Sequence, residues 1–217
     1  MTLTDIDASA GREGLAVFGA FHPRAGDETP DGTGTLVLLG PSEPGFWPHV
    51  TKAPEFLDGA PDPLDRWSSR VIGDLACAFA ATALFPFGGP PFRPFVRWAL
   101  ASGRAWQSPV TLLVHETAGL MLSYRGALAL TERLELPATR PARPCDTCAD
   151  RPCLTACPVQ ALASGHYDVA ACHAFLDTDA GQACMSQGCD VRRSCPVSRN
   201  YGRLPQQSAF HMARFHR

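Results

Sequence analysis

The stretch CDTCADRPCLTACP, residues 145–158, places four cysteines in one short segment, and Pro158 directly follows the last of them. A second run, CMSQGCDVRRSCP at residues 184–196, repeats the design with three cysteines and also ends on a Cys-Pro pair. Each run has a four-residue gap between two of its cysteines. Cys172 lies between the runs and Cys77 stands far from both, so eight of the nine cysteines fall in the last third of the chain.

This spacing is typical of thiolates that bind two four-iron clusters. Such a cluster needs four thiolates that converge on a compact cube, and in two-cluster ferredoxins the fourth cysteine of each run, followed by proline, binds the other cluster. One Cys-Pro pair at the end of each run therefore predicts a crossover of ligands. The predicted ligands of the first cluster are Cys145, Cys148, Cys153 and Cys195. The predicted ligands of the second cluster are Cys157, Cys172, Cys184 and Cys189.

Three other interpretations of the cysteines stay open. Two zinc sites would also use eight thiolates, although zinc ribbons give no reason for the two prolines. A disulfide framework is disfavoured without a secretion signal. Unligated cysteines packed as small hydrophobes are disfavoured because Asp146, Asp150 and Arg151 make these loops polar. A three-iron cluster could replace one four-iron cluster where the spacing is loose. Cys77 is expected to be a buried small side chain on a helix.

Composition excludes several classes of protein. The 217 residues are 45% hydrophobic, and the net charge of −2 comes from scattered charges, which predicts no nucleic-acid surface. The N-terminal segment is acidic and lacks the apolar run of a signal peptide. No stretch reaches the ~20 apolar residues that span a membrane. We therefore expect a cytoplasmic protein that binds no membrane, in a compartment where clustered cysteines bind metal or act in redox chemistry. The oligomeric state is not predicted.

The chain is expected to form two domains. The proline-rich segment RLELPATRPARP, residues 133–144, predicts a linker at 138–144 between a domain at 1–137 and a cysteine-rich domain at 145–217. The first domain is expected to be α+β. Its predicted elements are a buried strand at 34–40, a helix at 62–80 capped by Asp62, a loop at 85–94, a helix at 95–103 and a β-hairpin that joins 110–115 to 120–130. A terminal helix within 205–217 is expected to fold back over the cysteine-rich domain, with a frayed tail as the alternative.

Residues 145–196 resemble the ferredoxin-like module of epoxyqueuosine reductases and reductive dehalogenases. The segment AACHAFL, residues 170–176, matches the segment that carries a lone cysteine between the two runs of those enzymes. The gaps within the two runs are wider here than in those enzymes. The resemblance implies a small ferredoxin-like domain with two [4Fe–4S] clusters, and the wider gaps affect which cysteine binds which cluster.

Residues 33–137 resemble the CblC cobalamin-trafficking proteins. The resembling segments are TGTLVLLGPSEPGFW, DPLDRWSSRVIGDL, FRPFVRWA and LLVHETAGLMLSYRGALAL, in the same order as in that family. The resemblance implies a nitroreductase-like α+β fold that holds a corrinoid and helps to remove its upper axial ligand reductively. A GWIGKHT-like segment, expected of epoxyqueuosine reductases, is absent, so tRNA modification is not implied.

A corrinoid pocket needs a broad apolar floor with polar groups at its rim. The expected lining residues are Phe87, Gly88, Gly89, His115, Tyr124, Arg125 and Gly126, of which Arg125 and Gly126 fall on the arginine–glycine pair of the CblC family. The alternative interpretation is that the aromatic residues belong to the core and that Arg125 is structural. No residue clearly supplies a lower cobalt ligand, while His49, His166 and His173 stay candidates. Flavin is a further candidate cofactor.

The function that follows is single-electron transfer through two clusters, directed to a corrinoid in the N-terminal domain for reductive processing. One alternative is a simple ferredoxin-type carrier that docks a partner redox enzyme and binds no corrinoid. A second alternative is a zinc-stabilised binding module. Within the cysteine-rich domain, Ser186, Ser194 and the loop backbone amides are candidate hydrogen-bond donors to cluster sulfur. Arg192 and Arg193 are expected to form a solvated pair, with the alternative that they raise a cluster's potential or mark a docking face.

Overall fold

A computed structural model describes residues 1–138, 141–162 and 165–216. Its contacts divide the chain into two compact units. The first unit holds Met1–Arg104 and Ser123–Arg140, and the second holds Ala105–Leu122 and Pro141–Arg217. The units differ from the expected domains in one segment, 105–122, which was expected in the first domain. Within the predicted linker, Thr139 and Arg140 lie outside the described residues.

The first unit contains a four-stranded antiparallel sheet. Its strand order is β1-β2-β6-β3, with bounds Leu15–Phe21, Thr35–Pro41, Gly126–Leu130 and Thr82–Leu84 respectively. Every residue of β2 and β6, the two central strands, is buried. The buried strand predicted at 34–40 is therefore confirmed as β2. The mixture of helices with a small antiparallel sheet is consistent with the predicted α+β class.

A bulge in β1 places the Phe18 side chain against β2. The pairing of β1 with β2 shifts register between Val17 and Gly19, and Phe18 lies at the shift. A Cβ at Gly40 would come within 2.3 Å of the Phe18 ring. Glycine is thus required at position 40 because the aromatic ring occupies the space that any side chain would need.

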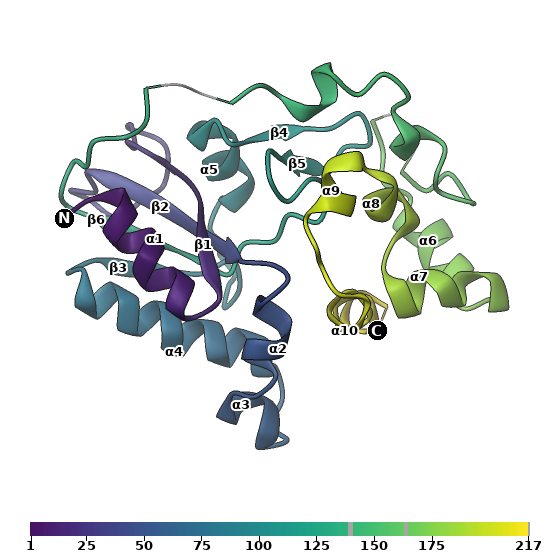
Figure 1. Ribbon diagram of the computed structural model, residues 1–217, viewed down its shortest axis with the longest axis horizontal. Helices are drawn as coiled ribbons and strands as arrows, with labels where there is room; N and C mark the ends of the chain where they lie inside the picture. Colours follow the sequence, from purple (N-terminus) through teal and green to yellow (C-terminus); the bar gives the residue numbers. More distant parts are fainter. Residues whose placement is uncertain (139–140, 163–164, 217) are drawn as a thin grey trace. The chain divides into compact units, whose positions relative to one another are not determined.

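Helices pack against this sheet. Figure 1 shows α4, Pro63–Ala78, running alongside β3, and it also contacts β6. The helices α1, Leu3–Arg12, and α5, Phe95–Ser102, both contact β1. Two short helices, α2 at Phe46–Val50 and α3 at Pro54–Leu57, precede α4. The predicted helices at 62–80 and 95–103 are confirmed, and the predicted loop at 85–94 contains no helix or strand.

Two details of α4 differ from expectation. Asp62 is the residue before the first turn, but its backbone is left-handed at φ 51° and its side chain makes no capping hydrogen bond. Cys77 is exposed, so the prediction of a buried thiol is wrong. The buried stripe of the helix includes Leu75 and Ala76, and the next residue points away from the sheet because successive helical residues are rotated by about 100°.

The predicted hairpin between 110–115 and 120–130 does not form. Its first half contains β5, Leu113–His115, which pairs with β4, Ala105–Gln107, in the second unit. Its second half contains β6, which pairs with β2 and β3 in the first unit. The apolar residues of the first half are buried as expected, but Val110, Val114 and Leu120 pack against Cys153, Val191 and Cys195 instead of against a neighbouring strand.

Hydrogen bonds attach this segment to the rest of the second unit. The Leu120 N–H donates to Ser198 Oγ at 2.8 Å, and Arg203 Nη1 donates to the Met121 carbonyl at 2.9 Å. Gly119 has φ +56°, and a Cβ there would lie 2.5 Å from the Ser198 nitrogen. The close approach and the positive φ both require glycine at this position.

The rest of the second unit is built from short helices. Two 3₁₀ turns, η1 at Pro144–Asp146 and η2 at Pro152–Leu154, carry the first cysteine run. The remaining helices are α6 (Val169–Leu176), η3 (Asp179–Gly181), α7 (Gln182–Gln187), α8 (Asp190–Ser194), α9 (Pro196–Asn200) and α10 (Pro205–Phe215). The α10 helix packs on α7, which confirms the predicted terminal helix and its return onto this part of the chain. No helix among the described residues is both long and apolar enough to cross a membrane.

Candidate metal centre

Four cysteines line one cavity of the second unit, which we name the first cysteine cavity. They are Cys145, Cys148, Cys153 and Cys195, and the cavity has a volume of about 160 Å³. Local structure brings them there: Cys145 and Cys153 lie on the two 3₁₀ turns, and Cys195 immediately precedes α9. The side chains of Val114, Leu120 and Val197 add apolar wall.

The other four clustered cysteines line another cavity, the second cysteine cavity. They are Cys157, Cys172, Cys184 and Cys189, around a space of about 20 Å³. Cys172 lies on α6, Cys184 on α7, and Cys189 immediately precedes α8. Phe175, Leu176 and Met212 enclose the space with apolar side chains.

The grouping of the eight cysteines coincides with the grouping predicted from sequence. Cys157, the last cysteine of the first run, borders the second cavity, whereas Cys195, the last of the second run, borders the first cavity. All eight carry free thiols. That these two sets hold metal stays a prediction.

Among the described residues, no three His, Cys, Asp or Glu side chains are close enough together to hold a single metal ion. Four thiolates around one tetrahedral zinc would lie about 3.8 Å apart, since each Zn–S bond is about 2.3 Å. A four-iron cluster carries its thiolates on four different iron atoms, so its ligand sulfurs stand farther apart.

Burial raises the pKa of several of these thiols. For Cys145 and Cys153 the main cause is desolvation, and the neighbouring cysteines of the same cavity also raise the pKa. For Cys184, burial raises the pKa to about 11. These thiols are therefore protonated at neutral pH without metal, and metal binding would release their protons.

Hydrogen bonds reach the sulfur atoms of the second cavity. The Ala161 N–H donates to Cys157 Sγ at 3.2 Å, and the Tyr167 hydroxyl donates to Cys172 Sγ at 3.6 Å. The Ala161 amide is one of the loop backbone donors expected from the sequence, whereas the Tyr167 hydroxyl was not among the expected donors.

The two serines expected to donate to sulfur do not do so. Ser186 donates to the Gln182 carbonyl at 2.8 Å, and Ser194 to the Val191 carbonyl at 2.9 Å. Serine inside a helix commonly bonds a carbonyl of the preceding turn, which is the physical reason for this difference.

The expected solvated pair of arginines is also wrong. Arg193 forms an ion pair with Asp190, but Arg192 turns inward, and its Nη1 donates to the Leu120 carbonyl. Desolvation lowers the pKa of Arg192, and the nearby Cys189 and Tyr167 act in the opposite direction.

Of the expected corrinoid residues, Phe87 and Arg125 are brought together. The Arg125 guanidinium carbon lies 6.0 Å from the centroid of the Phe87 ring, and that ring stacks on Phe85 at 5.1 Å between centroids. Arg125 is buried and pairs with Asp65 at 3.0 Å, while its Nε has no hydrogen-bond partner among the described residues. Gly88 and Gly89 belong to the same loop as Phe87.

The other expected corrinoid residues have core positions or lie in the second unit. The Tyr124 ring packs against Phe18 and Phe95, and its hydroxyl is buried without a hydrogen-bond partner among the described residues. A Cβ at Gly126 would meet Ile72 at 2.7 Å, so that glycine serves close packing. His115 belongs to the second unit, where its Nδ1 accepts hydrogen bonds from the Thr117 and Ala118 amides.

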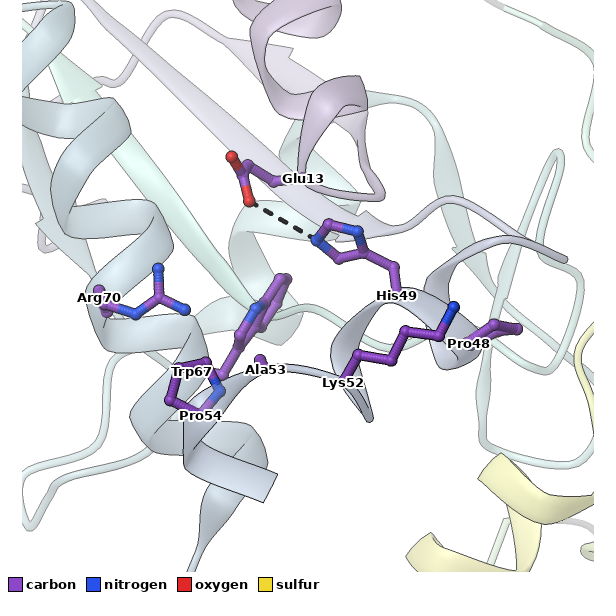
Figure 2. A pocket seen from close by; sticks show the side chains of 8 residues that line it. All are labelled: Glu13, Pro48, His49, Lys52, Ala53, Pro54, Trp67 and Arg70. Carbon is purple, nitrogen blue, oxygen red and sulfur yellow. Dashed lines mark ion pairs between the residues drawn. The ribbon is translucent and has the colours of Figure 1, made fainter. Parts of the chain in front are cut away.

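The three candidate histidines differ in their surroundings. His49 lines a groove of about 520 Å³ on the first unit, and Figure 2 shows its ring directed at Glu13, 3.6 Å away, with Trp67 in the middle of the groove. The remaining lining residues are Pro48, Lys52, Ala53, Pro54 and Arg70. His166 is exposed, and His173 Nδ1 lies 3.2 Å from His216 Nδ1.

Comparisons with protein-family models, with curated proteins and with solved structures return no match to this chain. The resemblances to the ferredoxin-like modules and to the CblC proteins accordingly stay predictions.

Proposed function

We propose that this protein transfers single electrons through two [4Fe–4S] clusters, one in each cysteine cavity. The observation that carries the proposal is the division of eight free thiols into two sets of four. The first set contains the last cysteine of the second run, and the second set contains the last cysteine of the first run. This is the ligand exchange that two-cluster ferredoxins use. A ferredoxin-like fold of the second unit is part of the same proposal.

Each cavity offers four thiols to such a group, and the lining of the second cavity also includes the Asp190 carboxylate. The lining of the first cavity contains four cysteine thiols and no carboxylate or imidazole. Once deprotonated, these thiols form a soft donor set, which favours iron–sulfur clusters, zinc or copper(I) over harder ions. When bound, the clusters would supply one-electron oxidation and reduction. Leu120 and Val197 limit water at the first cavity and Met212 at the second, while Ala161 and Tyr167 donate hydrogen bonds to ligand sulfur.

Metal and sulfide analysis tests the proposal. Protein purified without oxygen is expected to be brown and to contain about eight irons and eight sulfides per chain. Cys172→Ser should reduce both contents towards one cluster, whereas Cys77→Ser, which changes an exposed thiol away from the cavities, should leave them unchanged. Two zinc ions per chain, without sulfide, would contradict the proposal and support the zinc-stabilised binding module.

We further propose that the electrons reach a corrinoid held by the first unit, in a nitroreductase-like domain. The stacked Phe85 and Phe87 rings offer apolar area, and the buried Tyr124 hydroxyl and Arg125 Nε are polar groups without hydrogen-bond partners in the described part of the chain. Each electron that leaves a cluster would lower the oxidation state of cobalt by one, and a one-electron reductant such as a reduced flavoprotein would refill the cluster. We place this reaction in the cytoplasm, where thiols stay reduced.

A titration separates this function from that of a simple carrier. Cobalamin added to the cluster-loaded protein should change its visible spectrum and elute with the protein, and Arg125→Gln should weaken the binding. Arg97→Gln, which changes an exposed arginine of the same unit, is the control. No spectral change and no co-elution would exclude the corrinoid and leave the ferredoxin-type carrier that docks a partner redox enzyme. The same titration with flavin tests the remaining cofactor.

A further inference from the structure

In each cysteine cavity, the charge of an arginine acts on one of the cysteines: Arg143 on Cys145 and Arg192 on Cys189. Arg151 also lines the first cavity. Near the first cavity, the Arg143 guanidinium interacts with the Cys145 sulfur and acts to lower the pKa of that thiol against the raising effect of burial. Its Nη2 donates to the Gln107 carbonyl at 2.7 Å, and its Nε is buried without a hydrogen-bond partner among the described residues. The guanidinium is therefore held in place by the backbone of β4 and turned towards a ligand sulfur.

The second cavity has Arg192 in the corresponding role. The Arg192 guanidinium is held by the Leu120 carbonyl and is close enough to Cys189 and Tyr167 for charge to act between them. Tyr167 in turn donates its hydroxyl to Cys172, another cysteine of the same cavity. The positive charge of Arg192 thus lies near Cys189, one of the four predicted ligands, and near Tyr167, which donates a hydrogen bond to another.

Over residues 1–138, 141–162 and 165–216, neither guanidinium has an acidic partner. Among the described residues, no Asp or Glu forms an ion pair with Arg143 or Arg192, although Arg66, Arg70, Arg97, Arg125 and Arg193 all have one. A cation removed from water without a counter-charge is costly, and this cost applies to the desolvated Arg192, whereas Arg143 is only half-buried. Four thiolates around an iron–sulfur cluster carry net negative charge and would provide that counter-charge.

We propose that Arg143 and Arg192 are potential-setting residues, Arg143 for the cluster in the first cysteine cavity and Arg192 for the cluster in the second. This inference rests on the proposed iron–sulfur function. A cluster gains one negative charge when it takes up one electron, so a nearby fixed cation stabilises the reduced state more than the oxidised state. Net charge and hydrogen bonds to sulfur are among the determinants of cluster potential. Each arginine therefore raises the reduction potential of its own cluster.

Arg199 offers a control of equal charge. It is an exposed residue of α9 whose backbone N–H donates to the Cys195 carbonyl at 3.1 Å and whose side-chain Nε is 3.4 Å from the Arg193 carbonyl. Within the described part of the chain, its guanidinium contacts no cysteine. Arg199→Gln removes one positive charge from the same unit as Arg143→Gln or Arg192→Gln does. Because solvent screens exposed charges, its effect on either cluster should be small.

The test is a redox titration of the cluster-loaded protein, followed by electron paramagnetic resonance. Arg143→Gln should lower the midpoint potential of one cluster and Arg192→Gln that of the other, each by about tenfold in the equilibrium constant, or ~59 mV for one electron. The double variant should show both shifts, and Arg199→Gln should show neither. Equal shifts of both clusters in every variant, or shifts no larger than those of Arg199→Gln, would overturn the inference.

Two further measurements keep the outcomes distinct. Iron and sulfide are counted in each variant first, because wild-type protein without clusters contradicts the proposed function itself, whereas loaded variants with unchanged potentials contradict only the role of the arginines. If a glutamine variant loses a cluster, the corresponding Arg→Lys variant, which keeps the positive charge, is titrated in its place. A midpoint potential near that of wild type supports the charge effect. A fall in midpoint potential that corresponds to tenfold or more in the equilibrium constant, although the charge is retained, overturns it.

Discussion

Cys77 differs from the other eight cysteines in what surrounds its sulfur. It is exposed on α4, one residue beyond the buried stripe of that helix, while the others line the two cavities. An exposed thiol reacts through its thiolate with any reagent that reaches it, and ligand thiolates are occupied. We therefore expect the loaded protein to be alkylated at one cysteine per chain.

Mass spectrometry of the alkylated, digested protein checks this prediction. The label should be found on Cys77 alone, and Cys77→Ser should abolish labelling while it changes the free energy of unfolding by no more than about 0.5 kcal/mol, as is usual for surface substitutions. After iron is removed, the eight cavity cysteines should label as well. Rapid labelling of several cysteines in the loaded protein would contradict the prediction.

Individual residues also show how much of the candidate site could be predicted from the sequence. The division of the cysteines depends on short spacings and on two prolines, all of which are local, and the cavities group the residues as those spacings suggested. The inward turn of Arg192 depends on where Leu120 lies, far away in the chain, and no local pattern carries that information. The exposure of Cys77 could have been derived, because helical geometry places it off the stripe that contains Leu75 and Ala76.

Between elements, one ion pair links α3 to α4. Glu55 accepts hydrogen bonds from Arg70 Nε at 2.6 Å and Nη2 at 3.2 Å. These bonds lower the pKa of Glu55, with burial opposing them. Because the pKa is lower in the folded state than in the unfolded state, the stabilisation is complete above the unfolded-state value and is lost as the pH falls through the folded-state value.

Glu55→Gln should therefore be destabilising at pH 7 and much less so in acid. We expect a loss of about 1 kcal/mol or less at pH 7, since the Arg70 side chain is 47% exposed and solvent weakens the pair. Urea unfolding at pH 7 and near pH 3.5 measures the difference. Glu28→Gln, which removes the more exposed partner of Arg97, is the control and should cost less. An equal loss for Glu55→Gln at both pH values would show that the ion pair is not the cause.

The failed hairpin shows a limit of element prediction. An alternation of apolar residues indicates that a segment is buried but not what buries it. Val110, Val114 and Leu120 are buried as the pattern requires, yet they pack with Cys153 and Val191, which follow more than thirty residues later. By contrast, α4 and β2 could be predicted because each has a strong local pattern and clear end signals, including Pro63 at the first turn.

At the scale of the whole molecule, 105–122 belongs with the cysteine-rich part of the chain. If clusters support the second unit, their removal should release this segment together with residues 141–216. The sheet of the first unit has its own buried strands and should stay folded.

Hydrogen exchange with and without clusters tests this grouping. On removal of iron, amides of 105–122 should lose protection in parallel with those of α6 to α9, while amides of β2 and β6 keep theirs. Unchanged protection of 105–122 would assign the segment to the first unit, as the sequence suggested.

The exchange of one cysteine between the two runs also bears on how the protein matures. Cys157 and Cys195 each border the cavity that the other run mainly forms, and the five residues of α8 span directly from Cys189, at the second cavity, to Cys195, at the first. Insertion of a cluster into either cavity would therefore immobilise the backbone that carries ligands for the other. The second cluster would then be inserted with a smaller loss of conformational entropy than the first. Half-filled chains should therefore be fewer during biosynthesis than independent insertion into the two cavities would give.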